Sequence, residues 1–267
     1  MSDSISSWVQ FGTAAFVGGV IVKLLDWLQA ELHRSSKAAA KAKVVVEDEL
    51  DPLLKAAGSL GGKLRSLAVE DFVELAKFRQ PTVGKAGNDE TDFANLLYLF
   101  GRFWAQIEIL EIQSRYVRLA KNATGSRLLK FLNCLEARSV RLVERGWQRA
   151  FGGILLERRG EQVECMSFAE FLRRYRTEPG WCEWFEPLTQ VLRTVGERSK
   201  RQRLLLYGVV LHALVDDLDP SHEIVHDRPP YPNKLSKRIR RDLRYKVFPV
   251  YLPFVAGHRK YWHVAAE

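Results

Sequence analysis

The residues best suited to chemistry lie between positions 212 and 227. The segment from His222 to His226 reads H-E-I-V-H, which matches the H-E-x-x-H pattern of zinc peptidases. On a helix, two histidines at this spacing bind zinc from one face, and the glutamate activates a metal-bound water. Here Pro220 and Pro229 leave barely two turns of helix, and no third ligand follows in the expected form. We therefore assign no zinc peptidase, and Glu223 is a candidate catalytic residue only under an alternative function.

A broader set of ligand-type side chains surrounds this motif. His212 and Asp216 are four residues apart on a predicted helix, a spacing that places them on one face and favours a hydrogen bond between them. The plain interpretation is a core histidine oriented by a carboxylate. The alternative joins them with His222 and His226, and more loosely with Asp217, Asp219 and Asp227, in a hydrolytic centre, with zinc or another divalent cation as cofactor. A metal-dependent hydrolase is thus the second function that the sequence allows.

The other chemical signal is a basic segment near the C-terminus. Residues 232–263 carry nine basic residues and one acidic residue, so this stretch accounts for +8 of the net charge of +9. Leu235, Ile239 and Leu243 form one apolar stripe, which predicts a basic amphipathic helix followed by aromatic residues. The cations predicted to bind an anionic partner are Lys234, Lys237, Arg238, Arg240, Arg241, Arg244 and Lys246.

Four interpretations of this basic helix stay open from the sequence, one of which is a contact surface for a protein partner. It could lie on an anionic membrane surface, where each cation contributes about 1 kcal/mol. It could instead bind the phosphates of a nucleic acid. It could also be a solvated helix face whose aromatic residues complete the core. We favour an anionic lipid surface over nucleic acid as the partner.

Other enzyme motifs are not found in the sequence. Residues 58–63 read G-S-L-G-G-K, which lacks the spacing and the hydroxyl residue of a phosphate-binding P-loop. No nucleophile elbow or dinucleotide-binding fingerprint occurs. The three cysteines are widely spaced, which indicates a reducing compartment and no disulfide framework. The sequence therefore favours an interaction or effector module over an enzyme.

The chain begins with a segment that could cross a membrane. Residues 4–22 carry no charge, and the stretch from Trp8 to Leu28 would form about 31 Å of helix, enough for a hydrocarbon core of about 30 Å. Trp8 and Trp27 lie near its ends, and the basic residues cluster just downstream, between positions 33 and 43. We expect a retained single-pass anchor in the cell membrane, with the N-terminus outside and the bulk of the chain cytoplasmic.

Small residues within this segment predict self-association. Ala14 with Gly18, and Ala15 with Gly19, are pairs spaced four apart that would let two membrane helices approach closely in a homo-oligomer. The strictly apolar part, residues 11–22, is short for a span, so a buried core helix is the main alternative. An amphipathic helix lying in the membrane interface is another.

The remaining chain predicts a mainly α-helical fold. We expect an anchor over residues 1–30, a juxtamembrane helical connector over 31–60, and a helical cytoplasmic domain over 61–267. The apolar spacing predicts helices over 44–60, 62–78, 93–121, 126–151 and 203–218, with a loop over 79–91. Two short runs around Gly160 allow one small β-hairpin over 154–166, and Ser167 with Glu170 forms a capping box before the next helix.

Overall fold

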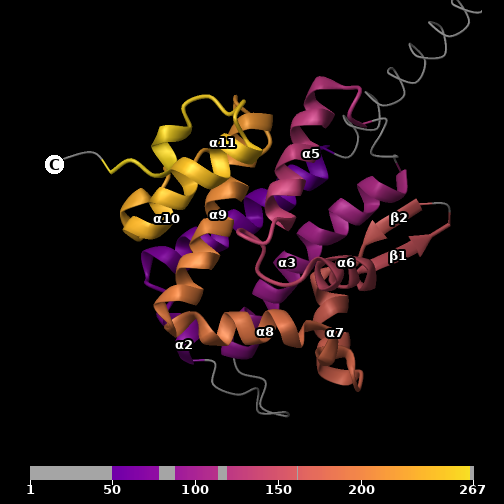
Figure 1. The fold of residues 1–267 in the computed structure, drawn as a ribbon. Coiled ribbons are helices and arrows are strands. Elements are labelled where there is room, and N and C mark those ends of the chain that lie inside the picture. The colour runs from indigo at the N-terminus through magenta and orange to yellow at the C-terminus, as the bar shows by residue number, and fades with distance from the viewer. Residues whose placement is uncertain (1–49, 78–87, 114–118, 161, 265–267) are drawn as a thin grey trace, which may run out of the picture.

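The computed structural model describes residues 50–77, 88–113, 119–160 and 162–264, and this part of the chain is mainly helical with one small antiparallel β-hairpin (Figure 1). Residues 50–69 form the first described helix. The elements that follow are α2 Val73–Lys77, α3 Asn88–Gln113, α5 Ala123–Glu136, α6 Arg145–Ile154, β1 Leu156–Arg159, β2 Gln162–Cys165, α7 Phe168–Thr177, η1 Trp181–Phe185, α8 Glu186–Arg193, η2 Thr194–Gly196, α9 Arg198–Leu218, η3 Pro232–Lys234, α10 Lys237–Asp242, the π turn η4 Leu243–Val247, α11 Phe248–Tyr251 and η5 His258–Tyr261.

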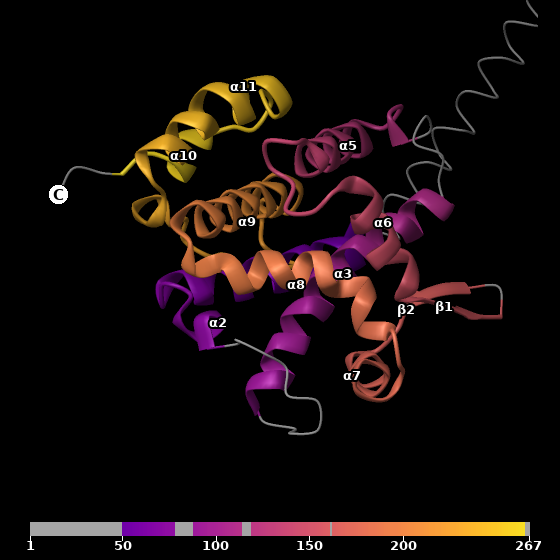
Figure 2. The same cartoon turned by 60° about the horizontal axis from the view of Figure 1, so that its bottom comes forward.

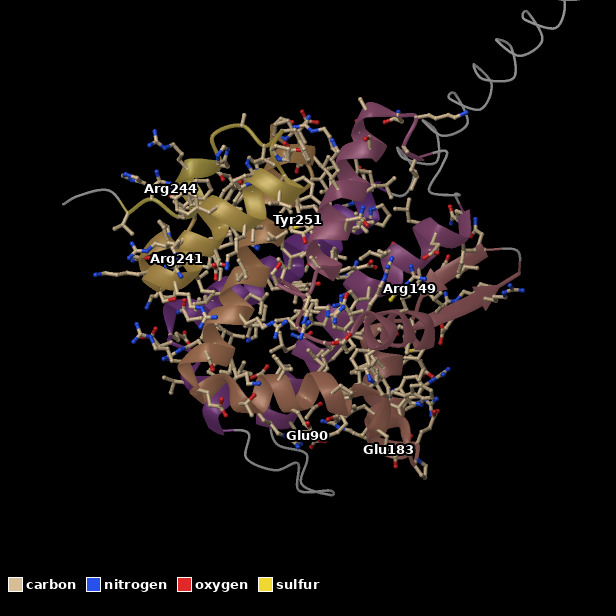
Figure 3. The ribbon with its side chains drawn as sticks, viewed as in Figure 1. Glu90, Arg149, Glu183, Arg241, Arg244 and Tyr251 are labelled. Atoms are coloured by element: carbon tan, nitrogen blue, oxygen red, sulfur yellow. The ribbon has the colours of Figure 1, made fainter. Side chains whose placement is uncertain are left out.

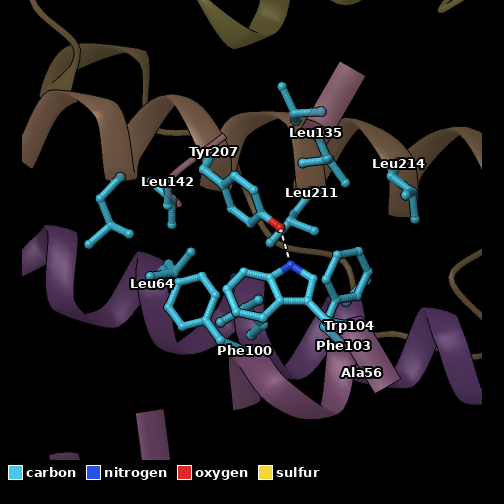
Figure 4. Packing of buried hydrophobic residues seen from close by; sticks show 14 of the residues in the cluster. Ala56, Leu64, Phe100, Phe103, Trp104, Leu135, Leu142, Tyr207, Leu211 and Leu214 are labelled. Carbon is cyan, nitrogen blue, oxygen red and sulfur yellow. Dashed lines mark hydrogen bonds between the residues drawn. The ribbon is translucent and has the colours of Figure 1, made fainter. Parts of the chain in front are cut away.

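The core is built around the two longest helices among these elements, α3 and α9. The predicted apolar face of α3 is buried, including Phe100 and Trp104. On α9, residues 204–211 are buried on every side, as their uniformly apolar sequence predicts. Between the two helices, the Trp104 indole Nε1 donates a hydrogen bond to the Tyr207 hydroxyl at 3.1 Å (Figure 4). This bond satisfies the polar atoms of two large side chains inside an apolar core.

Three predicted helix boundaries are wrong. The predicted break between helices over 44–60 and 62–78 is absent, since residues 50–69 form one helix and the chain turns only after it, before α2. Residues 126–151 form two helices and not one, because α6 packs against α3 whereas α5 packs against α9. The chain must turn between these two directions, and the Ala137 amide closes the turn on the Cys134 carbonyl. The predicted loop over 79–91 ends too late, since α3 already begins at Asn88.

The predicted hairpin and the Ser167 half of the predicted capping box are confirmed, whereas the Glu170 carboxylate accepts from Arg173 and Arg174. Strand β1 pairs with β2 in an antiparallel register that sets Leu156 opposite Cys165, and Gly160 makes the turn with φ of 68°. The Ser167 hydroxyl then accepts a hydrogen bond from the Glu170 amide at 3.2 Å and caps α7. The hairpin lies on the opposite side of the molecule from α10 and α11, as the two views in Figures 1 and 2 agree.

The predicted membrane anchor over residues 1–30 lies outside the described residues, as do Ala14, Ala15, Gly18 and Gly19. Of the predicted connector, only residues 50–60 are described, and they belong to the core through Leu53, Leu54 and Leu60. Within the ranges that the structure describes, none of the helices combines the length and the apolar character needed to cross a bilayer.

Candidate functional sites: a histidine–aspartate cavity and a basic face

The histidine and aspartate residues predicted as metal ligands gather around one cavity. Its walls are the second half of α9, the helix over residues 50–69, and the loop over residues 219–231 that folds back after α9. His212 and Asp216 face the cavity from α9, and His222 and His226 face it from the loop. The structure therefore brings together residues that are 14 positions apart in the sequence.

The loop is held by a buried carboxylate. Asp219 is 4% exposed, and its two oxygens accept hydrogen bonds from the backbone amides of Glu223, Ile224 and Val225 at 2.9–3.0 Å. The H-E-x-x-H residues consequently lie in a tight loop and not on a helix. His222 has a φ of 54°, a left-handed conformation that is uncommon for a residue other than glycine. Glu223 is exposed and does not line the cavity.

Glycines on the helix over residues 50–69 and on α9 let this loop lie close to both helices. A Cβ atom at Gly58 would come within 2.4 Å of the Val225 side chain, and one at Gly208 within 2.5 Å of the Tyr231 hydroxyl. Arg228 donates a hydrogen bond from Nη1 to the Gly58 carbonyl at 2.7 Å. Gly58 and Gly62 of the G-S-L-G-G-K segment thus allow close packing against the loop.

Asp216 is the centre of the polar cluster. Its Oδ1 atom lies 3.4 Å from His212 Nε2 and 3.9 Å from His222 Nε2. Its Oδ2 atom accepts a hydrogen bond from the Tyr261 hydroxyl at 2.6 Å and lies 2.5 Å from Lys260 Nζ. His212 and Asp216 lie side by side as their spacing predicts, but the predicted hydrogen bond between them is not formed. Residues 260 and 261 are partners that helical periodicity could not reveal.

The electrostatics of this cluster follow from its burial. Burial lowers the pKa of His212, an effect that the nearby Asp216 carboxylate opposes and the Lys260 ammonium reinforces. Burial, together with the hydrogen bond to Asp216, raises the pKa of Tyr261. Both changes favour the uncharged forms of the two side chains that flank Asp216.

The basic helix of the C-terminal segment is flanked by two grooves. The first groove, which we call the C-groove, lies between α10, η4 and η5 and is lined by Arg240, Arg241, Arg244, Tyr245, Gly257, His258, Arg259, Trp262, His263 and Val264. No acidic residue is among them. Figure 3 shows Arg241 and Arg244 extending outward on one side of the molecule, whereas Glu90 and Glu183 lie at its lower end. Stacking of Phe248 on His258 and Tyr261 holds η5 against the helix.

The second groove, the N-groove, combines cations from three separate segments. Lys237 and Arg238 come from α10, Arg198 and Arg203 from α9, and Arg138 from the turn between α5 and α6. Gln202 fixes the arrangement, because its Oε1 accepts from the Ser236 amide at 2.6 Å and its Nε2 donates to the Lys234 carbonyl at 2.9 Å. No sequence pattern indicated Arg198, Arg203 or Arg138 as members of this groove, since they lie outside the basic segment.

Like charges in the N-groove affect one another. Arg203 donates from Nη2 to the Arg138 carbonyl at 2.8 Å. Burial, and then the nearby guanidinium of Arg141, lower the pKa of Arg203. Asp242 is the acidic residue among those lining this groove, and it lies 2.9 Å from Lys246 Nζ. The groove therefore keeps a marked excess of positive charge.

The seven predicted anion-binding cations do not share one surface. Lys234 turns toward the end of the helix over residues 50–69 and the turn after it, where its Nζ lies 3.2 Å from both the Val69 carbonyl and Asp71. Lys246 is engaged with Asp242. The other five line the two grooves, and no ion pair involves them within the described part of the chain.

Comparison with known proteins identifies no relative. No known family, no curated protein and no solved structure matches this chain.

Proposed function

We propose that this protein is a helical interaction module that docks on the anionic surface of a membrane through the two basic grooves flanking α10. The observation that carries the proposal is the convergence of nine arginine and lysine side chains on these grooves. Four belong to the C-groove and five to the N-groove. Because they come from four separate segments, the fold and not the basic segment alone concentrates this charge.

Exposed apolar side chains next to the cations favour a lipid surface over a nucleic acid. Tyr245 is 58% exposed and Val250 is 65% exposed, and both lie on the helical stretch that carries Arg241 and Arg244. A membrane interface accepts both kinds of side chain, since cations contact headgroup phosphates while apolar residues enter the headgroup boundary. A nucleic acid could stack on Tyr245 but would gain nothing from an exposed valine.

The expected strength follows from the number of cations. At about 1 kcal/mol for each cation near an anionic leaflet, the four C-groove cations supply about 4 kcal/mol, or nearly a thousandfold in partitioning. The predicted single-pass anchor would add to this, and with its N-terminus outside it would place the grooves at the anionic cytoplasmic leaflet. The proposal for the grooves does not depend on that anchor.

The metal-dependent hydrolase has less support as a function. The cavity beside Asp216 has a volume of about 30 Å³, which holds a water-sized species but no organic substrate. Glu223, its candidate general base, is exposed and lies outside the cavity lining.

Vesicle flotation of the full-length protein tests the proposal. Neutral phosphatidylcholine vesicles are compared with vesicles that also contain phosphatidylserine, because a hydrophobic anchor would insert into both and only the grooves would discriminate. Replacing Arg241 and Arg244 by glutamine should lower the preference for anionic vesicles about thirtyfold, at about 1 kcal/mol per cation. The matched control replaces Arg158 and Arg159 on the distant hairpin, with the same loss of charge and no expected loss of binding.

Three outcomes would contradict the proposal. The first is equal binding of the wild type to neutral and anionic vesicles. The second is an equal loss in the hairpin control, which would indicate a response to net charge alone. The third is binding to DNA or RNA, with a steep salt dependence that the Arg241 and Arg244 replacements reduce, in the absence of binding to anionic vesicles.

A further inference from the structure

We infer that Asp216, His222, Asp227 and His212 form a structural binding site for a divalent cation of the zinc class, which fastens the 219–231 loop to α9. This site is separate from the basic grooves and does not depend on the proposed membrane contact. Among the described residues, the ligand atoms of Asp216, His222 and Asp227 all lie within 4.8 Å of one another. His212 joins them through its contact with Asp216.

The spacing of the atoms fits tetrahedral coordination. Ligand atoms bonded to zinc at about 2.0–2.1 Å in a tetrahedron are about 3.3–3.4 Å apart. Here the separations are 3.4 Å between His212 Nε2 and Asp216 Oδ1, and 3.5 Å between His222 Nε2 and Asp227 Oδ1. The third, between Asp216 Oδ1 and His222 Nε2, is 3.9 Å. Asp216, His222 and Asp227 thus lie close enough together to hold one ion, whereas His212 is near Asp216 but outside this group, so its ring must move closer to make the fourth bond.

One atom of the cluster lacks a partner that a cation would supply. The Asp216 side chain is 10% exposed, and its Oδ1 atom is shielded from solvent and receives no hydrogen bond within the described structure. A buried carboxylate oxygen without a donor is costly. Tyr261 and Lys260 occupy only the other oxygen, Oδ2, so they orient the carboxylate and leave Oδ1 directed at the two histidines.

The histidine rings are also set for ligation. His222 Nδ1 lies 3.2 Å from the Val225 carbonyl oxygen, and a proton on Nδ1 that is donated there leaves the lone pair on Nε2 directed at the cluster. Such a bond from the second ring nitrogen to a carbonyl is the usual way in which proteins orient a metal-binding histidine. The left-handed backbone of His222 is what turns its ring toward α9.

Charge and access are compatible with an ion. The Asp216 and Asp227 carboxylates carry two negative charges, and the Lys260 ammonium offsets one of them, so a dication bound by neutral histidines leaves a net charge of +1. Two imidazoles with two carboxylates suit zinc better than magnesium or calcium, which prefer oxygen ligands alone. The Asp227 side chain is 77% exposed, which provides an entry path from solvent.

Metal analysis of the full-length protein tests this site. The protein is stripped with a chelator, reloaded with Zn²⁺, desalted and analysed for metal. We expect about one equivalent in the wild type and at least a tenfold weaker affinity in Asp216→Asn and His222→Asn, where asparagine tolerates the left-handed backbone of position 222. The matched control is His226→Asn, which makes the same replacement four residues away in the same loop and should keep the metal.

Three further readouts distinguish the loss of a ligand from the loss of the fold. At a free Zn²⁺ concentration of about 100 times Kd, binding should raise the Tm of the wild type by about 5–10 °C and leave that of His222→Asn unchanged. The far-UV circular dichroism of the metal-free proteins should be the same for both. Co²⁺ in place of Zn²⁺ should give the intense visible absorption of a four-coordinate ion in the wild type and in His226→Asn.

The inference would be overturned by a reloaded wild type without stoichiometric metal. It would also be overturned if His222→Asn kept the metal, or if His226→Asn lost it to the same extent, since the ion would then bind surface histidines. Binding of His222→Asn to anionic vesicles should match the wild type, so a failure of either proposal leaves the other standing.

Discussion

Replacing Asp219 by asparagine should loosen the loop that carries His222 and Asp227. In the wild type, Asp219 Oδ2 accepts from the amides of Ile224 and Val225, and Oδ1 accepts from the amide of Glu223. An asparagine side chain offers only one acceptor oxygen and places an NH₂ group against the remaining amide donors. Each hydrogen bond to a charged acceptor contributes about 1.5–3 kcal/mol.

The magnitude depends on which amides can find water after the replacement. Val225 is buried, so its amide would have no partner if its bond to residue 219 were lost. Glu223 is exposed, so its amide can be hydrated instead. With the carboxamide oriented to keep the bonds to Ile224 and Val225, the loss is one bond and the charge of the acceptor. We therefore expect Asp219→Asn to lower the free energy of unfolding by about 3 kcal/mol, which corresponds to a fall in Tm of about 6–12 °C.

Urea unfolding followed by far-UV circular dichroism measures this change, and hydrogen exchange locates it. The amides of residues 223–225 should lose protection in Asp219→Asn. The matched control is Asp71→Asn, whose carboxylate is 66% exposed and pairs with Lys234 at the surface, where an ion pair contributes at most about 1 kcal/mol. A change below about 1 kcal/mol in Asp219→Asn, or unaltered protection of these amides, would show that the Asp219 carboxylate does not hold the loop.

Two further predictions concern the core. A Cβ at Gly152 would come within 2.7 Å of the Trp104 carbonyl oxygen, whereas one at Gly153 would meet nothing within 4 Å. Gly152→Ala should therefore lower the free energy of unfolding by about 2 kcal/mol. Gly153→Ala should leave it unchanged or raise it by up to about 1 kcal/mol. Denaturant unfolding measures both changes, and equal effects would contradict the close approach of α6 to α3. Burial, followed by the nearby Glu111, raises the pKa of Glu108 above its ordinary value of 4.5, so the folded state binds more protons than the unfolded state just above that pH. Stability should thus fall as the pH rises from 4.5 through the raised pKa, and Glu108→Gln should flatten this fall in unfolding measurements at a series of pH values; a profile as steep as that of the wild type would assign the effect to other groups.

The features predictable from the sequence are those that local patterns determine. The buried face of α3, the apolar helix α9 and the Ser167 cap each depend on residues within a few positions of one another. The break between α5 and α6 was not predictable in this way. It depends on which helix each half packs against, and this is a property of the tertiary fold.

In the candidate sites too, contacts between residues close in the sequence were predictable and tertiary contacts were not. The pairing of His212 with Asp216 follows from helical spacing. The roles of Lys260 and Tyr261 do not, because these residues approach Asp216 from a segment more than 40 positions away. In the basic face, Arg203 reaches the N-groove from the middle of the chain, and no composition count near the C-terminus could include it.

The π turn η4 divides the C-terminal helix into two halves with different surfaces. A π turn adds one residue to a helix, which rotates everything after it by about 100° relative to a continuous α-helix. Leu243 at the start of the turn and Phe248 directly after it are both fully buried despite this rotation. The outward side is cationic at Arg244 and apolar at Val250. Deleting a single residue within the turn would restore a continuous α-helix and rotate α11 by about 100°, so that Phe248 would leave its buried position. The length of this segment is therefore as constrained as its composition.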